Sequence, residues 1–351
     1  ACIFLDQNNT CRIHARFGPE GKPFACRPYP FVLLPAGKQA RVSLRFDCPS
    51  VAGNQGRPLP EHRTEIQALL ARALPPRLAE AEPPAFRPGL HLDWQALARI
   101  AGAFDRLLAT ETLDITRRML ACADLAGLLA RATLADLEGP KLDDFLGVLV
   151  RALTAGVAVN PLQRRQPVGM VPPLFRQAAG LYGRLDRLID QGGSAGQRLA
   201  RLGRRLGHSL RLLGGRGTVP PVREGLPSAR FADLECPFGI PGPEAAAVLT
   251  RYYRVKLDGF GFCGRAVYGW SFLEGVGALL LTFPLILWYA RLFALGAGRP
   301  ALDAEMVQRA VRVVDRPHGN TVALALPHER IRLRFLAEHE NLSTLIVWYG
   351  T

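Results

Sequence analysis

Lysine is scarce in this chain, although its 351 residues carry a formal net charge of +14. Almost all of the cations are arginines, a bias that we attribute to a GC-rich coding sequence rather than to function. The chain has no basic stripe interleaved with aromatic residues and no nucleic-acid-binding motif, so we do not expect nucleic acid as a partner. The only lysines are Lys22, Lys38, Lys141 and Lys256.

Several catalytic motifs are missing as well. No histidine pair has the H-E-x-x-H spacing of a helical zinc protease, and no nucleophile elbow supports Ser–His–Asp hydrolysis. The C-x3-C-x2-C group of radical enzymes and the glycine-rich strand–turn–helix of dinucleotide-binding domains are also absent. The glycine-rich run Gly259–Gly264 follows a helix-like stretch, and we predict a tight turn there. The sequence therefore assigns no catalytic residue.

The cysteine usage favours a reducing compartment. Seven cysteines, an odd number concentrated at one end, do not resemble the disulfide framework of a secreted protein, and no signal peptide is seen. We therefore expect a cytoplasmic protein. A hydrophobic content of 48% and a charged content of 21% are typical of a globular fold, and the length allows two or three domains.

Four of the seven cysteines lie within the first 48 residues, which makes this segment the strongest candidate for function. Each lies beside residues that turn or cap the chain, and thiolates in such loops most often hold a metal. We predict that Cys2, Cys11, Cys26 and Cys48 bind zinc or an iron–sulfur cluster. Free thiols that pack as small hydrophobic side chains are the alternative. His14 is a further candidate ligand, although a place beside the ligands or on the surface is the simpler interpretation.

The other three cysteines are scattered along the chain. Cys236 and Cys263 lie among residues typical of turns, so a second pair of ligands is an alternative to the more common buried structural thiol. Cys122 lies between two alanines of a predicted helix, and we expect it to pack in the core.

The N-terminal run also resembles a known family. The strings CxFLD, CRIH, KPFACRPYPF and DCPS occur in this order, and together they are similar to the YkgJ-type cysteine-cluster proteins. These are described as zinc- or iron-chelating domains, and the family includes the flagellin lysine-N-methylases. The resemblance covers about the first fifty residues. It rests on Cys2, Phe4, Leu5, Asp6, Cys11, Ile13, His14, Lys22, Pro23, Cys26, Arg27, Tyr29, Pro30 and Cys48.

The resemblance implies a metal- or cluster-binding protein. Through the methylase branch it also implies methyl transfer from S-adenosylmethionine to lysines of a flagellin-like protein substrate. Family members usually carry a C-x-x-C…C-C group just upstream of the matched positions. Because the sequence begins at Ala1 without that group, we expect further ligands to precede Ala1 in a longer chain. A membrane-associated metalloprotein is the third hypothesis.

We predict a mainly α-helical fold, in which a small cysteine-rich head with one hairpin is joined to a helical body. The hairpin comprises Phe31–Pro35 and Ala40–Phe46, since alternate residues of its second strand are apolar. The expected units are residues 1–59, 60–215 and 228–351, with Gly- and Pro-rich stretches between them. Helices are expected at Glu61–Ala73, Asp93–Ala109, Thr112–Ala132, Leu142–Val157, Leu174–Asp190, Ala195–Leu213, Pro243–Leu257, Tyr268–Leu295 and Asp303–Val314.

The last thirty or so residues give a mixed signal. Residues 330–335, RIRLRF, alternate between charged and apolar side chains, which favours a strand. Asn341–Tyr349 is compatible with either a strand or a helix.

Tyr268–Leu295 is the longest apolar stretch. We predict a buried central helix, because its uncharged run is shorter than the roughly 20 residues of a membrane span and Pro284 would kink it. Membrane insertion is the alternative. Glu274 is expected near a pocket or a cation, with Arg265 and Arg291 as candidate partners.

Ala195–Leu213 places its leucines on one side and its arginines elsewhere. Such a helix could lie on an anionic membrane or bind an acidic protein. We favour the solvated outer face of a bundle helix, because Gly203 and Gly207 weaken an isolated helix. The leucines are Leu199, Leu202, Leu206, Leu210 and Leu213, and the arginines are Arg201, Arg204, Arg205 and Arg211.

Overall fold

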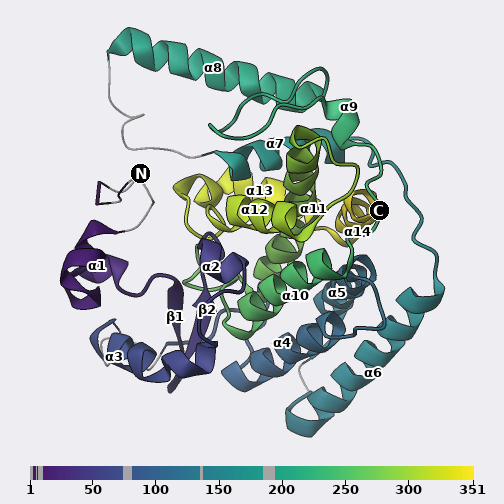
Figure 1. Cartoon of the computed structure of the whole chain (residues 1–351). Coiled ribbons are helices and arrows are strands. Elements are labelled where there is room, and N and C mark those ends of the chain that lie inside the picture. Colours follow the sequence, from purple (N-terminus) through teal and green to yellow (C-terminus); the bar gives the residue numbers. More distant parts are fainter. Residues whose placement is uncertain (1–2, 5, 7–10, 74–80, 135–136, 185–193) are drawn as a thin grey trace.

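The computed structural model describes residues 3–4, 6, 11–73, 81–134, 137–184 and 194–351. Within these residues the protein is 61% helical, with fourteen α-helices and one two-stranded sheet. The predicted mainly α-helical fold with an N-terminal hairpin is therefore confirmed. The head lies to one side of a larger body of helices (Figure 1).

The hairpin is the centre of the head. Its strands β1 (Phe31–Ala36) and β2 (Gln39–Leu44) pair antiparallel, with Phe31 opposite Leu44. Gly37 makes the turn with a φ of 63°, a conformation that favours glycine. The other head elements are α1 (Arg12–Phe17), α2 (Pro49–Ala52), α3 (Arg63–Ala73) and the 3-10 turns η1 (Pro19–Gly21), η2 (Phe24–Cys26) and η3 (Leu59–His62).

The body helices often begin where a short polar side chain accepts a hydrogen bond from the first turn. Asp93, Asp114 and Asp303 each accept from the backbone N–H three residues further on. The predicted helix starts near Asp93 and Asp303 agree with this. The body contains α4 (Trp94–Leu108), α5 (Ile115–Arg131), α6 (Gly139–Val159), α7 (Val171–Gly183), α8 (Ala195–Gly214), α9 (Phe231–Leu234), α10 (Pro243–Asp258), α11 (Phe272–Gly296), α12 (Ala304–Asp315), η6 (Val322–Ala325), α13 (Pro327–Leu336) and α14 (His339–Gly350).

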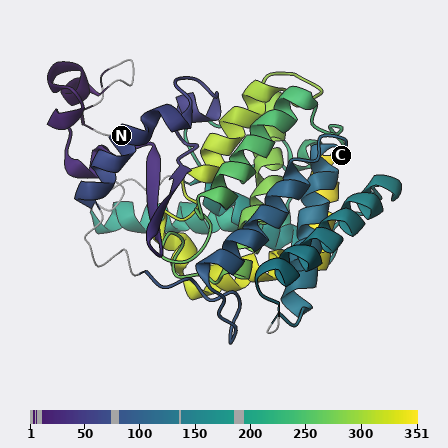
Figure 2. The same cartoon turned by 90° about the horizontal axis from the view of Figure 1, so that it is seen from below.

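Helix α11 is the central element of the body. It packs against α5, α12, α13 and α14, and 21 of its 25 residues are buried. Its length and composition would suffice to cross a membrane, but 94% of its most apolar window is covered by the protein itself. The helix is thus buried, as the sequence predicted. Figure 2 shows this body from below, with the head to one side.

Two sequence-based expectations about the C-terminal half are wrong. Residues 330–335 form part of helix α13 and not a strand, because Leu333 and Leu336, three residues apart, are both buried on one helical face. Glu274 pairs with Arg330 and Arg334 rather than with Arg265 or Arg291. Burial alone would raise the pKa of Glu274, but hydrogen bonds and charges from its two arginines more than offset this, so its pKa lies below the usual value.

Arg291 has a different role, which explains why it does not reach Glu274. Its side chain is fully buried and donates to backbone carbonyl oxygens of Leu234, Cys236 and Tyr349, each at 2.8–2.9 Å. Burial lowers the pKa of this guanidinium to about 10, which still leaves it charged at neutral pH. Arg291 therefore ties α9 and the C-terminal end of α14 to α11.

Candidate functional site

The N-terminal cysteines lie in loops and at the starts of helices. Cys11 and Cys48 occupy the positions just before α1 and α2, and Cys26 is the last residue of η2. Cys26 is exposed, Cys11 and Cys48 are partly exposed, and all three are free thiols. Neither helix-start thiol accepts a capping hydrogen bond from its own helix. Cys2 lies outside the described residues.

The hairpin aligns the chain segments that lead to two of these cysteines. The Arg45 N–H donates to the Pro30 carbonyl at 2.8 Å, which extends the ladder by one step beyond Phe31 and Leu44. Next to this end lies Tyr29, whose pKa is raised mainly by partial burial and further by the nearby charges of Asp47 and Cys48. The Tyr29 side chain therefore lies near the Cys48 thiol.

The described cysteines are not grouped closely enough to form a metal-binding ligand set. Across residues 11–73 and the rest of the described chain, no three His, Cys, Asp or Glu side chains are grouped so that they could hold a metal ion. His14 is exposed on α1. The donor chemistry suits a soft metal, because the thiols are free and accessible. The predicted metal site itself stays a prediction, since Cys2 is not described.

Apolar packing in this part of the head is sparse. No residue of α1 is buried, and Ile3, Phe17 and Phe24 are 77%, 64% and 47% exposed. The head's separate hydrophobic cluster has only three buried members, Phe31, Ile66 and Leu69. The segments around Cys11 and Cys26 therefore have little apolar contact to fix their positions.

The remaining cysteines differ from the N-terminal group. Cys122 and Cys263 are fully buried, and burial raises the pKa of both thiols. Cys122 packs in the core, as predicted. Cys236 is exposed, and its thiol lies 3.5 Å from the Ala232 carbonyl oxygen. Among the described residues, Cys236 and Cys263 do not belong to a metal-binding group.

A buried ion pair joins the head to the body. Lys256 of α10 and Asp315 of α12 approach to 2.6 Å, with side chains that are 7% and 1% exposed. Lys256 also donates to the Leu44 carbonyl at 3.0 Å. The other Asp315 oxygen accepts the N–H groups of Phe46 and Asp47, the residues just before Cys48. The position of Cys48 is therefore set by the helical body.

Two more buried titratable side chains, His318 and Tyr182, lie near this ion pair. His318 is buried, and its Nδ1 lies 3.0 Å from the Tyr182 hydroxyl oxygen. Burial, and secondarily the charge of Lys256, lowers the pKa of His318 to about 3, so the imidazole is neutral at physiological pH. Sequence reasoning missed this cluster, because its members lie on three helices and in the turn after α12, and they share no motif.

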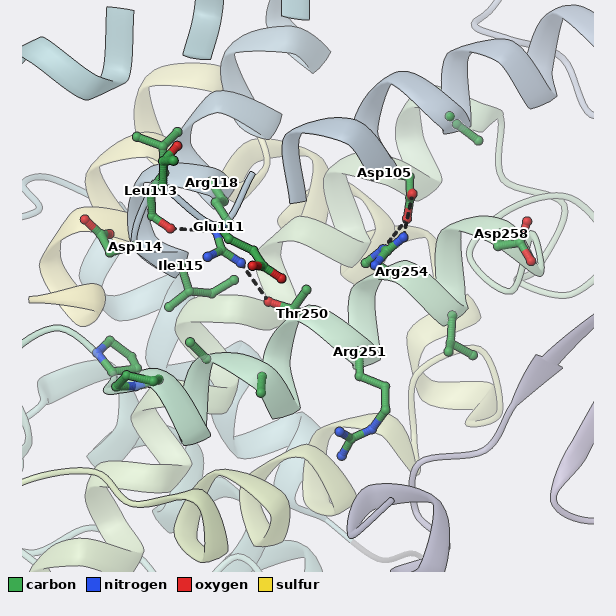
Figure 3. A pocket seen from close by; sticks show the side chains of 18 of the residues that line it. Asp105, Glu111, Leu113, Asp114, Ile115, Arg118, Thr250, Arg251, Arg254 and Asp258 are labelled. Atoms are coloured by element: carbon green, nitrogen blue, oxygen red, sulfur yellow. Dashed lines mark hydrogen bonds and ion pairs between the residues drawn. The ribbon is translucent and has the colours of Figure 1, made fainter. Parts of the chain in front are cut away.

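A large cavity lies between α4, the start of α5, α10 and strand β2 (Figure 3). Its volume is about 1080 Å³. Arg254 forms a two-point ion pair with Asp105, at 2.7 and 3.0 Å. Arg118 donates to the Leu113 carbonyl and to the Thr250 hydroxyl, and burial lowers its pKa. The cleft is large enough for a cofactor-sized ligand.

The cleft carries both signs of charge. Its four arginines are matched by four carboxylates, so it is not strongly biased towards cations or anions. Two of the arginines are paired with carboxylates of the same lining, Arg254 with Asp105 and Arg41 with Asp258. The arginines are Arg41, Arg118, Arg251 and Arg254, and the carboxylates belong to Asp105, Glu111, Asp114 and Asp258.

The glycine-rich run near this cleft has a packing role. Gly259 and Gly261 directly follow α10, and a Cβ at either position would lie 2.5–2.8 Å from atoms of Ser43. The absence of side chains lets the turn after α10 lie against strand β2. This agrees with the predicted tight turn.

No family model, curated protein or solved structure matches the chain.

Proposed function

We propose that this protein binds zinc or an iron–sulfur cluster through its N-terminal head, with Cys2, Cys11, Cys26 and Cys48 as ligands. The observation that carries the proposal is the contrast between two groups of thiols. Cys11, Cys26 and Cys48 are free and at least partly exposed, and the segments around Cys11 and Cys26 have little apolar packing, whereas Cys122 and Cys263 are buried. A bound metal would supply the cross-links that this small lobe lacks.

Tyr29 supports the same assignment, because its side chain lies near the Cys48 thiol. A hydrogen bond to a metal ligand from outside the coordination sphere orients that ligand. We therefore give Tyr29 a positioning role at the proposed centre. Tyr29→Phe should weaken metal affinity and leave the number of bound ions unchanged.

Metal analysis of anaerobically purified protein tests the proposal. The preparation should carry any residues that precede Ala1 in the gene, and it is loaded with Zn²⁺ or with iron and sulfide. A cluster gives visible charge-transfer absorption, whereas zinc leaves the protein colourless. Cys26→Ser should reduce the bound metal, while Cys236→Ser, which removes another exposed thiol, should not. Metal-free protein with a folded head, or equal loss in both variants, contradicts the proposal.

Methyl transfer from S-adenosylmethionine to protein lysines is a second candidate, and the cleft in Figure 3 is the observation that favours it. S-adenosylmethionine has a carboxylate, an ammonium and a sulfonium, which suit a cleft lined by both signs of charge. Isothermal calorimetry with S-adenosylmethionine tests this on metal-loaded protein. Arg118→Gln should weaken binding, and Arg299→Gln, a surface control, should not. The absence of binding heat at several temperatures would remove the methyltransferase hypothesis.

A further inference from the structure

Helix α8 presents its leucines to the outside of the protein. Leu199, Leu202, Leu206 and Leu210 are 70%, 53%, 57% and 67% exposed. Their spacing places them on one side of the helix, in line with Leu213, which is 36% exposed. We call these five side chains the leucine stripe. Solvated bundle helices normally show the reverse arrangement, with the apolar side inward.

The stripe faces outward because α8 is held by its other side and mainly near its C-terminal end. Leu212, the buried residue of the helix, packs on Gly180 of α7, where a Cβ would lie 2.3 Å from its methyl group. Arg176 of α7 donates to the Leu212 and Leu213 carbonyls at 2.8 Å each. Figure 1 shows α8 along one edge of the molecule, above α7.

The helix does not need a partner to form its first turn. Ser194 accepts a hydrogen bond from the Gln197 N–H, and the Gln197 side chain accepts one from the Ser194 N–H. This reciprocal cap stabilises a helix start in water. The leucine stripe is therefore already ordered before anything covers it.

The charge of α8 indicates what covers the stripe. The helix contains five arginines and no aspartate or glutamate. At about 100° per residue, Arg198 and Arg205 lie on one side of the stripe and Arg211 on the other. Paired stripes from two copies would bring Arg198 and Arg211 of both helices together without one carboxylate from either helix. A second copy is therefore a poor occupant, and an anionic surface is a good one.

We propose that α8 is an interfacial helix that docks the protein on an anionic membrane surface. Leu199, Leu202, Leu206 and Leu210 enter the boundary between headgroups and acyl chains, and exposed arginines beside them, Arg198 and Arg211, reach lipid headgroups with their flexible stems. Each basic residue near such a surface adds attraction that salt weakens. The helix lies in the plane of the membrane, and α11 stays inside the protein.

Vesicle flotation with the full chain tests this proposal. The protein should float with phosphatidylcholine–phosphatidylglycerol vesicles at low salt, bind phosphatidylcholine vesicles at least about tenfold more weakly, and be released by added salt. The double variant Leu199→Gln/Leu206→Gln should bind the anionic vesicles about tenfold or more weakly, because two apolar anchors are lost. Both leucines are exposed, so the thermal unfolding temperature should be unchanged.

The matched control is Val148→Gln/Val159→Gln on α6, which removes two apolar side chains that are 55% and 81% exposed. It should bind anionic vesicles as the unaltered protein does. Equal loss in this control, no binding to anionic vesicles, or equal binding to both kinds of vesicle overturns the proposal. A dimer in sedimentation velocity that Leu199→Gln/Leu206→Gln dissociates, without vesicle binding, also overturns it and makes the stripe a self-association surface.

Discussion

Gly275 lies so close to Phe262 that a Cβ on the glycine would be 2.2 Å from the Phe262 carbonyl oxygen. Since the obstacle is backbone, it cannot be relieved by a rotamer change. We expect Gly275→Ala to lower the free energy of unfolding by about 2–4 kcal/mol, as overpacking at a buried contact does. Urea unfolding measures this. At Gly203 on α8, where a Cβ meets nothing within 4 Å, the same substitution should stabilise by about 0.5–1 kcal/mol.

A second prediction concerns the buried ion pair of Lys256 and Asp315. Lys256→Met leaves the Asp315 carboxylate buried without its cation, so we expect a loss of about 3–5 kcal/mol in the free energy of unfolding. Asp258→Asn breaks the exposed pair with Arg41 and should cost less than about 1 kcal/mol. Comparable losses from the two variants would show that burial does not decide the strength of these pairs.

His318 should make stability depend on pH. Its folded pKa of about 3 lies below the usual value, so the unfolded chain binds the extra proton first as the pH falls. The contribution of neutral His318 to the free energy of unfolding is fully present above the pKa of histidine in the unfolded chain. It is lost as the pH falls towards 3. Between about pH 7 and about pH 5 this amounts to about 2 kcal/mol.

Unfolding by urea at a series of pH values checks this dependence. His318→Gln should flatten the slope in the acid range, although it lowers stability at neutral pH. His328→Gln, which removes a side chain that is 65% exposed, should leave the slope as it is. An unchanged slope in His318→Gln would mean that another group sets the acid limit.

Alkylation followed by peptide mass spectrometry distinguishes the thiols. In metal-free native protein, exposed Cys26 and Cys236 should react quickly, while Cys122 and Cys263 should react only on unfolding. Loading with zinc should protect Cys11, Cys26 and Cys48 but not Cys236. Protection of Cys236 to the same degree would indicate non-specific metal binding.

Local signals in the sequence predicted much of the fold. The alternation around Val42 and Leu44 located the hairpin, and Asp93 and Asp303 marked helix starts, since capping and side-chain alternation depend on neighbouring residues. The strand prediction for residues 330–335 was wrong because six residues are too few to distinguish the alternation of a strand from about one and a half turns of helix.

The candidate sites were less predictable, because their geometry joins distant parts of the chain. Glu274 meets Arg330 and Arg334, which lie 56 and 60 residues further along the chain. The cleft draws its walls from β2, α4, α5 and α10, and no spacing rule connects them. The cysteines could be chosen from the sequence because the residue type alone gives the chemistry of a thiol. The residues that surround each thiol in space could not be predicted in this way.

The hydrogen bond from the Asp47 N–H to Asp315 gives Cys48 a special place among the head cysteines. Cys48 directly follows Asp47, which is anchored to α12, so its position is fixed by the body. Cys11, in contrast, precedes a helix that has no buried side chain. At the proposed metal centre, Cys48 would therefore be the ligand that the helical body holds in place. Removal of the residues that precede Phe31 should therefore leave the position of Cys48 unchanged.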